Sequence, residues 1–382
     1  MRCVLEYPDT CRVDVNPKFL EFMDGYWISD QLNNPLSSPL NTIWYEAETG
    51  KIMVRGMGYK GQFGQFGWDL MYTDMSEIVR PTRDGVYGRE YISTQVDLQR
   101  RSGIVNPSKP KNSILSIPLP IIYDYLPANM LSNSITQSIR GAINKIGTFA
   151  IDTVEGSPKN TILLLTDNNY EEYISVMENF RIIEYEGENP AKIISQMKEH
   201  TVIFYRMKLS EESLAKSEEI VNLGFDGIHL IADYHGFDFS KQSKFVQPRL
   251  HKIHKNLVAK GLRDKIIIIV SGGVNQAEHV PKAIMSGADA VAIDIVSLIA
   301  LQVQIQGNSR FSNNITIGMD SFDIEWGIQR LINLTTSWYN QLIEIMSAMG
   351  IKDVRRLRGE MGRAILDNEI REVAFDGIEQ ID

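Results

Sequence analysis

Cysteine and long apolar runs are scarce in this sequence, and each scarcity excludes a class of protein. The 382 residues contain two cysteines, Cys3 and Cys11, which exclude an iron–sulfur site of three or four thiolates built by this chain alone. No apolar run approaches the length that spans a bilayer. Residues 2–17 carry charges throughout and lack the apolar core of a signal peptide. We therefore expect a cytoplasmic protein without a membrane span.

Clustered positive charge is also lacking. The chain has 39 Lys and Arg against 48 Asp and Glu, which gives a formal net charge of −9, and it has no long basic run. Proteins bind nucleic-acid phosphates with clustered Lys and Arg. We expect no nucleic-acid partner.

The clearest pattern that is present lies in residues 265–301. Five apolar residues, 266–270, end in Ser271-Gly272-Gly273, and a helical pattern over 276–286 leads to a second apolar run at 290–293. A continuous apolar run bounded by glycines is typical of a strand buried on both faces of a parallel sheet. Glycines after such a strand let the backbone approach a ligand closely, and phosphate is the usual one. The stretch predicts a strand–helix–strand unit with a ligand at its glycines.

The same alternation of strand and helix precedes this unit. Strands are predicted at 114–122, 148–151, 161–166, 182–185, 202–208 and 227–232, and helices at 134–146, 170–180, 210–223 and 248–260. Together with the last two strands this makes eight, which favours an α/β fold of the (β/α)8 (TIM) barrel type over an open sheet.

Three parts are predicted along the chain. Residues 1–112 form an irregular, partly β region, with strand-like runs at 42–45 and 51–55. Residues 113–305 form the barrel. Residues 306–382 form a helical extension with a long amphipathic helix inside 321–349 and a last helix over 352–366. Four arginines on that last helix indicate a solvated face or an interface rather than an anion site: Arg355, Arg356, Arg358 and Arg363.

Residues 55–69 are rich in glycine, and the six residues from Gly56 match G-x-G-x-x-G. A dinucleotide site needs a helix directly after this motif, and the sequence that follows is a poor helix start. We favour a glycine-rich turn with Phe63, Phe66 and Trp68 packed beneath it.

Three segments in order resemble a known family, the FMN-binding synthase domain of glutamate synthase. Residues 254–291 read HKNLVAKGLRDKIIIIVSGGVNQAEHVPKAIMSGADAV and follow the family's order of helix, "GLRD", strand, "GG", helix and "GAD". Residues 131–157 are similar to its first helix and the loop after its second strand, and residues 339–360 to the helix pair that follows its barrel. The resemblance implies a TIM barrel with its ligand at the C-terminal mouth, where in the family reduced FMN passes electrons to 2-iminoglutarate.

The resemblance also implies which residues hold FMN. The family's FMN-contacting loop falls on Asp152, Thr153, Glu155 and Gly156. Its fifth-strand lysine, which lies near the flavin, falls on Arg206 or Lys208. Its phosphate-side glycines fall on the Ser271, Gly272 and Gly273 stretch.

Two departures leave the function open. Asp294 stands where the family has a glycine whose amide holds the FMN phosphate, and with Ser297 three residues on it is expected to cap the next helix instead. Residues 301–318 lack the cysteines of the family's iron–sulfur cluster, so we expect no cluster, and the glutaminase domain is absent as well. One hypothesis is an FMN-dependent oxidoreductase of CH–NH2 or imine chemistry, working with other protein subunits that donate electrons or ammonia, or as a homo-oligomer. The alternative is a flavin-free barrel that serves as a structural, regulatory or assembly subunit, and a third hypothesis is a barrel enzyme for another phosphorylated ligand.

Two further groups of residues are candidates for a metal site or for catalysis. His251 and His254 lie three apart on a predicted helix but have no third ligand at a matching spacing, so no metal site is expected. Asp233, His235 and Asp238 follow the sixth strand, where this fold carries its chemistry, yet Asp in such a loop also caps its own turn. Both interpretations stay open at this point.

Overall fold

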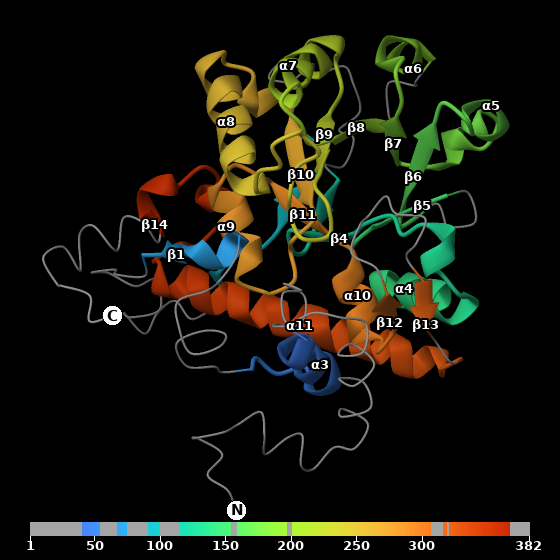
Figure 1. Ribbon diagram of the computed structural model, residues 1–382, viewed down its shortest axis with the longest axis vertical. Coiled ribbons are helices and arrows are strands. Elements are labelled where there is room, and N and C mark those ends of the chain that lie inside the picture. The colour runs from blue at the N-terminus through green and yellow to red at the C-terminus, as the bar shows by residue number, and fades with distance from the viewer. Residues whose placement is uncertain are drawn as a thin grey trace, which may run out of the picture.

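The barrel is the centre of the structure. The computed structural model describes residues 40–53, 67–74, 91–99, 115–153, 159–196, 201–306, 316–318 and 321–366. Eight parallel strands of this part close into a barrel (Figure 1), in the order β4 (Ile121–Tyr123), β5 (Ala150–Asp152), β6 (Thr161–Thr166), β7 (Ile182–Glu186), β8 (Val202–Lys208), β9 (Gly227–Ile231), β10 (Ile267–Ser271) and β11 (Ala290–Ile293). The predicted TIM barrel is confirmed.

The sequence of β10 shows why the barrel forms. Its five residues, IIIVS, are all buried, and it pairs in parallel with β9 on one side and β11 on the other. Branched apolar side chains on both faces suit a strand that has the barrel interior on one side and helices on the other. Residues 114–122 differ from the prediction, because Pro118 and Pro120 divide the expected strand into β3 (Ser116–Ile117), which pairs with β2 (Val96–Asp97), and the barrel strand β4.

Helices cover the outside of the barrel. They are α4 (Asn133–Ile146), α5 (Tyr170–Tyr173), α6 (Pro190–Gln196), α7 (Ser213–Leu223), α8 (Val246–Ala259), α9 (His279–Met285) and α10 (Ile295–Ala300). The predicted helix over 170–180 is shorter, since only α5 and the 3-10 turn η5 (Met177–Asn179) form. The helix predicted over 210–223 begins later, at Ser213, whose Oγ accepts a hydrogen bond from the Ser210 amide.

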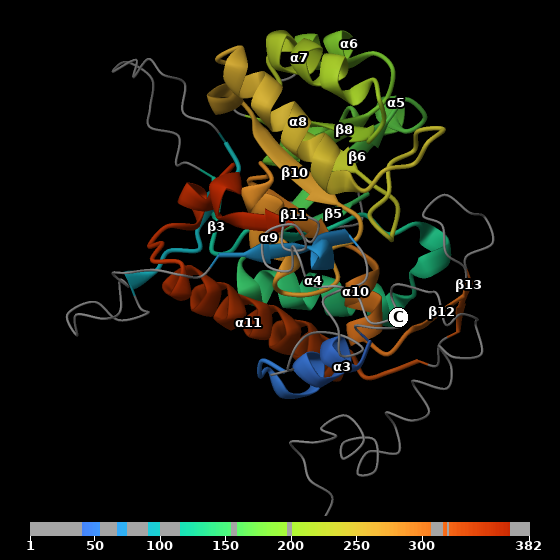
Figure 2. The same cartoon turned by 60° about the vertical axis from the view of Figure 1, so that its left-hand side comes forward.

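The predicted amphipathic helix near the C-terminus is confirmed as α11 (Ile324–Ala348). Asp323 caps it by accepting a hydrogen bond from the Trp326 amide. The helix lies along α4 on one side and along α3 (Leu40–Thr49) on the other (Figures 1 and 2). The strand expected at 42–45 is therefore wrong. Its apolar side chains are instead buried in α3, which packs on α11 and α10.

The last predicted helix is also wrong. Residues 352–366 form two 3-10 turns, η7 (Val354–Leu357) and η8 (Met361–Arg363), and then β14 (Ala364–Leu366), which pairs with β1 (Met71–Thr73). Gly359 explains the break, since its φ of 79° is left-handed and a side chain there would overlap His254. The N-terminal and C-terminal parts are thus joined by a small sheet.

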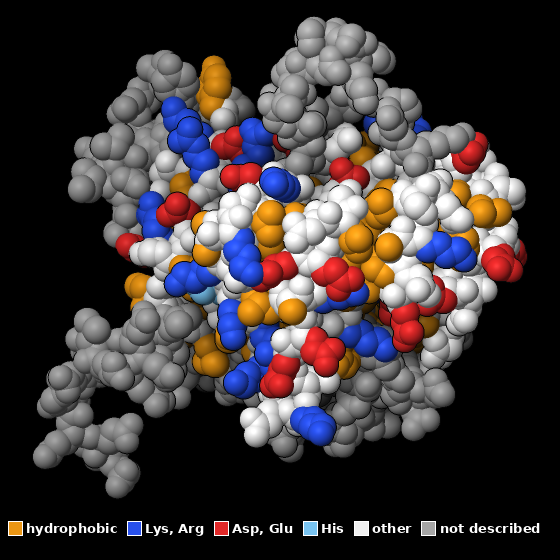
Figure 3. All heavy atoms as spheres, turned by 90° about the horizontal axis from the view of Figure 1, so that it is seen from above, with side chains coloured by type: hydrophobic (Ala, Val, Ile, Leu, Met, Phe, Trp, Pro, Cys, Tyr) orange, Lys and Arg blue, Asp and Glu red, His pale blue; other side chains and the backbone are white. Residues whose placement is uncertain are grey.

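Three features are relevant to binding partners: the surface charge, the apolar length of the helices and the structure within residues 301–318. Lys and Arg side chains are interspersed with Asp and Glu over the face in Figure 3. No helix among the described residues is long and apolar enough to cross a membrane. Within residues 301–318, β12 (Gln304–Gln306) and β13 (Thr316–Gly318) pair as an antiparallel hairpin.

Candidate active site at the barrel mouth

The expected site residues lie at the C-terminal ends of the barrel strands. Asp152 ends β5, Arg206 and Lys208 lie on the last half of β8, and Ser271 ends β10. Lys208 is exposed, whereas Arg206 is buried, with 4% of its side chain exposed. Of the two residues expected at the family's lysine position, only Arg206 is buried.

A charged cluster, buried except for the partly exposed Glu186, surrounds Arg206, and we call it the Arg206 cluster: Asp124, Glu184, Glu186, Arg206 and His229. Arg206 Nη1 donates to Asp124 Oδ1 at 2.7 Å and to Glu184 Oε1 at 2.9 Å, and its Nε lies 3.4 Å from Glu186 Oε2. His229 Nδ1 lies 2.8 Å from Glu184 Oε1. Through these side chains the cluster links the end of β4 to β7, β8 and β9, which pair with one another in the sheet.

The charges of the cluster stabilise one another. Burial alone would raise the pKa of Glu184, but His229 and Arg206 outweigh burial and hold the pKa below its usual value. Burial would likewise lower the pKa of Arg206, but Asp124 and Glu184 hold it above its usual range. Glu184 is therefore an anion and Arg206 a cation at neutral pH. An Arg206 engaged by three carboxylates is not a free cation for a ligand.

Two buried atoms of the cluster have no hydrogen-bond partner among the described residues, Glu184 Oε2 and His229 Nε2. His229 Nδ1 lies between Glu184 Oε1, at 2.8 Å, and Arg206 Nη1, at 3.2 Å, while Nε2 points away from both. Glu184 Oε2 and His229 Nε2 are thus polar atoms inside the barrel. Sequence reasoning missed them, although an acid within IIEYE and a histidine within GIHLI are unusual for buried strands.

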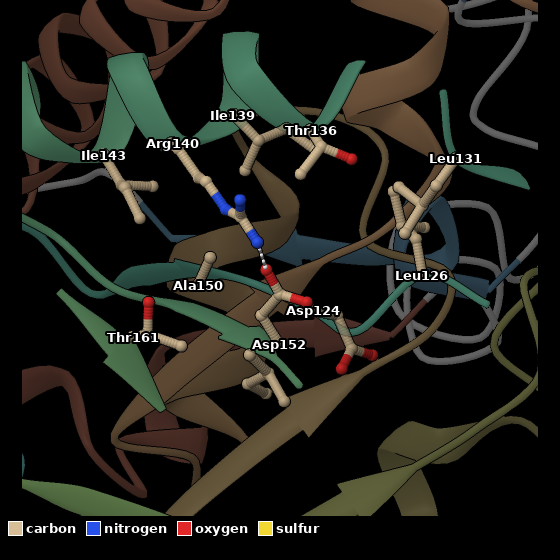
Figure 4. A pocket seen from close by; sticks show the side chains of 11 residues that line it. Asp124, Leu126, Leu131, Thr136, Ile139, Arg140, Ile143, Ala150, Asp152 and Thr161 are labelled. Carbon is tan, nitrogen blue, oxygen red and sulfur yellow. Dashed lines mark hydrogen bonds and ion pairs between the residues drawn. The ribbon is translucent and has the colours of Figure 1, made fainter. Parts of the chain in front are cut away.

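A pocket opens beside β4 and β5, under α4. It encloses about 400 Å³, including open solvent, and is lined by apolar side chains such as Leu126, Leu131 and Ile139. Figure 4 shows Arg140 reaching across it from α4 to Asp152, where Nη2 and Oδ2 are 2.9 Å apart. The pocket thus borders Asp152, one of the expected ligand residues.

The rest of the loop after β5 is only partly described. The Thr153 amide donates to Asp152 Oδ1 at 2.8 Å, so Asp152 both ends the strand and starts its loop. Glu155 and Gly156 lie outside the described residues.

Gly272 and Gly273 adopt left-handed φ angles of 96° and 71°. A Cβ on Gly272 would overlap the Asp233 carbonyl oxygen, and one on Gly273 would lie 2.7 Å from Gly236 Cα. Only glycine fits here. The sequence predicted that a ligand approaches the backbone of this glycine pair closely. In the structure the loop after β9 lies close to it.

Asp294 caps α10, as its position before Ser297 predicted. Its Oδ1 accepts a hydrogen bond from the Ile295 amide at 2.6 Å, and Ser297 Oγ donates to the Asp294 carbonyl at 2.6 Å. Asp294 is 3% exposed. A carboxylate therefore occupies the place where the family has a phosphate-binding glycine.

The family model for the conserved region in glutamate synthase matches residues 246–352, from α8 to just beyond α11. An archaeal-type glutamate synthase (NADPH) of Dehalococcoides mccartyi is 20% identical in an alignment 414 residues long, gaps included, that covers 86% of this chain and 82% of that protein. The chain is glutamate synthase-like.

Other relatives agree with this result. The archaeal-type glutamate synthase (NADPH) of Thermotoga maritima is 21% identical over 395 residues, which cover 83% of this chain and 78% of that protein. The archaeal glutamate synthase (NADPH) of Methanocaldococcus jannaschii is 31% identical over 126 residues, 31% of this chain and 24% of that protein. The resemblance stated from the sequence is confirmed, at low overall identity.

Solved structures share the fold. A flavocytochrome b2 mutant is similar with a TM-score of 0.55 and 13% identity, over 95% of this chain and 97% of that one. The flavin-binding domain of baker's yeast flavocytochrome b2 gives a TM-score of 0.52 and 11% identity, over 91% and 86%. At such identities the likeness concerns the fold alone.

In this glutamate synthase-like chain the loop after β9 uses its acids for turn chemistry. Asp233 Oδ1 accepts from the amides of His235 and Phe237 at 2.9 and 2.8 Å. Asp238 Oδ1 accepts from the Ser240 amide at 3.1 Å, and its other oxygen pairs with Arg249. The structural interpretation of this loop is confirmed for both aspartates.

Of the two histidines on α8, His254 is buried and His251 is half-buried. The rings of His251 and His254 stack with centroids 6.5 Å apart, and His254 Nδ1 accepts a hydrogen bond from Arg263 Nε at 3.1 Å. His254 is thus a packed side chain between Arg263 and Gly359.

The end of the glycine-rich stretch packs on the barrel, while residues 54–66, with Phe63 and Phe66, lie outside the described part. Trp68 is buried edge-on against Phe245. Asp69 Oδ1 lies 3.0 Å from His279 Nε2, and the Trp68 carbonyl accepts from the buried Lys282. The described end of the stretch is a packing element, as we favoured.

Arg356 is exposed, whereas the other three C-terminal arginines make contacts within the chain. Arg358 pairs with Asp289 at 2.9 Å, and Arg355 pairs with Asp353 and Asp97. Arg363 donates to two backbone carbonyls, of Met349 and Asp74. They tie residues 352–366 to the barrel and to the N-terminal part, rather than forming an exposed helix face.

Proposed function

We propose that this chain is a flavin-dependent oxidoreductase of the glutamate synthase type that acts on CH–NH2 or imine groups. The main support is the family-conserved region, which spans β10 and β11 and keeps the left-handed Gly272-Gly273 pair after β10. The named relatives are glutamate synthases over most of this chain. The pocket beside Asp152 supports a ligand where the resemblance expects the flavin.

The residues at the other end of the mouth do not fit FMN as the family holds it. Asp294 occupies the Ile295 amide, and the Gly272-Gly273 pair is packed against the loop after β9. Arg206 is engaged by carboxylates. A phosphate held at β10 and β11 would therefore meet an anion, and we assign no catalytic step to a flavin in this site.

We also infer that the chain works with other subunits. The support is the segment 301–318, which has no cysteine and contains the hairpin β12–β13 where the family has its iron–sulfur motif. Electrons and ammonia would then reach the barrel from partner chains.

The cap by Asp294 favours a second candidate function, a flavin-free barrel retained as a structural, regulatory or assembly subunit. A buried carboxylate in place of an amide-only loop is the change expected when phosphate binding is lost.

One experiment separates the two. The full-length protein is purified, its visible absorption spectrum is recorded, released small molecules are identified by mass spectrometry, and the protein is titrated with FMN and riboflavin. Retention or uptake of either flavin supports the oxidoreductase. A colourless protein that takes up no flavin overturns it and leaves the second candidate.

A further inference from the structure

We propose that Asp294 excludes a phosphate dianion from the β10–β11 end of the barrel mouth, so that the ligand of this site is unphosphorylated at that end. The proposal deepens the proposed function and rests on it in taking a flavin as the ligand. It predicts a preference for riboflavin over FMN.

Two backbone donors at this end are already committed. The Ile295 amide donates to Asp294 Oδ1 at 2.6 Å, and the Ser297 amide donates to the Asp294 carbonyl at 3.0 Å. Phosphate binding at the start of such a helix depends on free amides. The side chain of Asp294 already accepts the hydrogen bond of the first of these amides. A phosphate would therefore have to displace a hydrogen bond between two residues that are neighbours in the sequence.

The space at this end is also filled. The loop after β9 lies against the glycine pair, so that Asp233 and Gly236 occupy the side of Gly272 and Gly273 on which these residues have no side chain. The Ala232 amide donates to the Ser271 carbonyl at 2.9 Å and fixes the start of this loop against β10. The two glycines therefore allow the loop after β9 to pack against the end of β10.

The charge at this end opposes an anion. Asp294 is 3% exposed, so little water screens its carboxylate. Repulsion between a carboxylate and a dianion is much stronger in such surroundings than in water.

Riboflavin and FMN differ only in the phosphate and make a matched pair of probes. Binding of each to the full-length protein is measured by quenching of flavin fluorescence, for the wild type and for Asp294→Asn. The asparagine keeps the size and the capping oxygen but removes the charge. Asp264→Asn, at a carboxylate that is 91% exposed and lies at the opposite end of β10, is the control.

We expect the wild type to bind riboflavin at least tenfold more tightly than FMN. Asp294→Asn should reduce this ratio at least threefold, and Asp264→Asn should leave it unchanged. Equal or tighter binding of FMN by the wild type overturns the proposal while the proposed function stands. An unchanged ratio in Asp294→Asn overturns it as well.

A protein that binds neither flavin defeats the proposed function, and inorganic phosphate then tests the exclusion by itself. Phosphate should leave the melting temperature of the wild type where an equal ionic strength of chloride leaves it. Asp294→Gly, or Asp294→Asn if the glycine variant does not fold, should gain a phosphate-dependent rise. A wild type that phosphate stabilises, or a variant without such a gain, overturns the exclusion.

Discussion

Arg206 on the fifth barrel strand donates to Asp124 at the end of the first strand, with 2.7 Å between Nη1 and Oδ1. The bond crosses the inside of the barrel mouth, and neither strand is the other's neighbour in the sheet. Since both side chains are at most 4% exposed, the ion pair is removed from water. An ion pair shielded from water therefore links opposite sides of the barrel mouth.

Removal of Arg206 should be among the most destabilising single changes in the barrel. Arg206→Met leaves the buried carboxylates of Asp124 and Glu184 without their cation, which typically costs about 3–5 kcal/mol. Urea unfolding of the variant measures the loss.

Arg140→Met is the matched control for Arg206→Met, because the Arg140–Asp152 pair has a similar distance but side chains that are 20% and 21% exposed. It should cost no more than about 1 kcal/mol. Equal losses in the two variants would contradict the view that burial of the Arg206 cluster sets its energy.

The N-terminal helix α3 should make stability fall as the pH rises. Burial, with the charge of Glu278, raises the pKa of Glu46 to about 8, while its Oε2 accepts a hydrogen bond from Trp338 Nε1 at 3.0 Å. The folded state keeps its proton up to about pH 8, whereas the unfolded chain loses it near pH 4.5. The stabilisation is complete below pH 4.5 and is lost between pH 4.5 and 8.

Glu46→Gln tests this, because it cannot lose a proton. The variant should gain stability over the wild type as the pH rises, by roughly 3–5 kcal/mol across the window. The free energy of unfolding of both proteins is measured at several pH values from 4.5 to 8. Parallel curves would show that Glu46 is ionised in the folded protein.

His254 should have the opposite effect on the acid side. Burial, with the positive charges of Arg263 and Arg358, lowers the pKa of His254 to about 4. The unfolded chain takes up this proton near pH 6.5, so the unfolded state binds more protons between pH 6.5 and 4. As the pH is lowered from 6.5 to 4, the free energy of unfolding of the wild type should therefore fall by roughly 2–3 kcal/mol relative to that of His254→Gln. A difference between the two proteins that does not change with pH would contradict it.

The parts of the fold that the sequence predicted are those set by local pattern. The apolar run at 266–270, bounded by glycines, predicted a strand buried on both faces, which is β10, and the amphipathic pattern inside 321–349 predicted α11. The cap by Asp294 followed from a carboxylate placed directly before a helix. In each case neighbours in sequence decide the structure.

The parts that failed are set by distant contacts. In the Arg206 cluster, Arg206 and Asp124 are 82 positions apart in the sequence, and His229 and Glu184 are 45 positions apart. No sequence spacing predicts that such residues meet. Residues 42–45 look like a strand because Ile43, Trp44 and Tyr45 are good strand formers, but packing against α11 makes them helical.

The glycine pair after β10 offers the sharpest test of close packing at the mouth. Gly272 and Gly224 share a φ of 96°, so alanine is strained equally at both. A Cβ on Gly224 meets nothing within 4 Å, whereas one on Gly272 overlaps the Asp233 carbonyl oxygen, which is backbone and cannot rotate away. Gly224→Ala should cost about 1–2 kcal/mol from backbone strain alone. Gly272→Ala carries the same strain plus the overlap, so its loss in urea unfolding should exceed that of Gly224→Ala by at least about 2 kcal/mol. Equal losses would mean that the loop after β9 can move away from the pair, which would reopen this end of the mouth to a ligand.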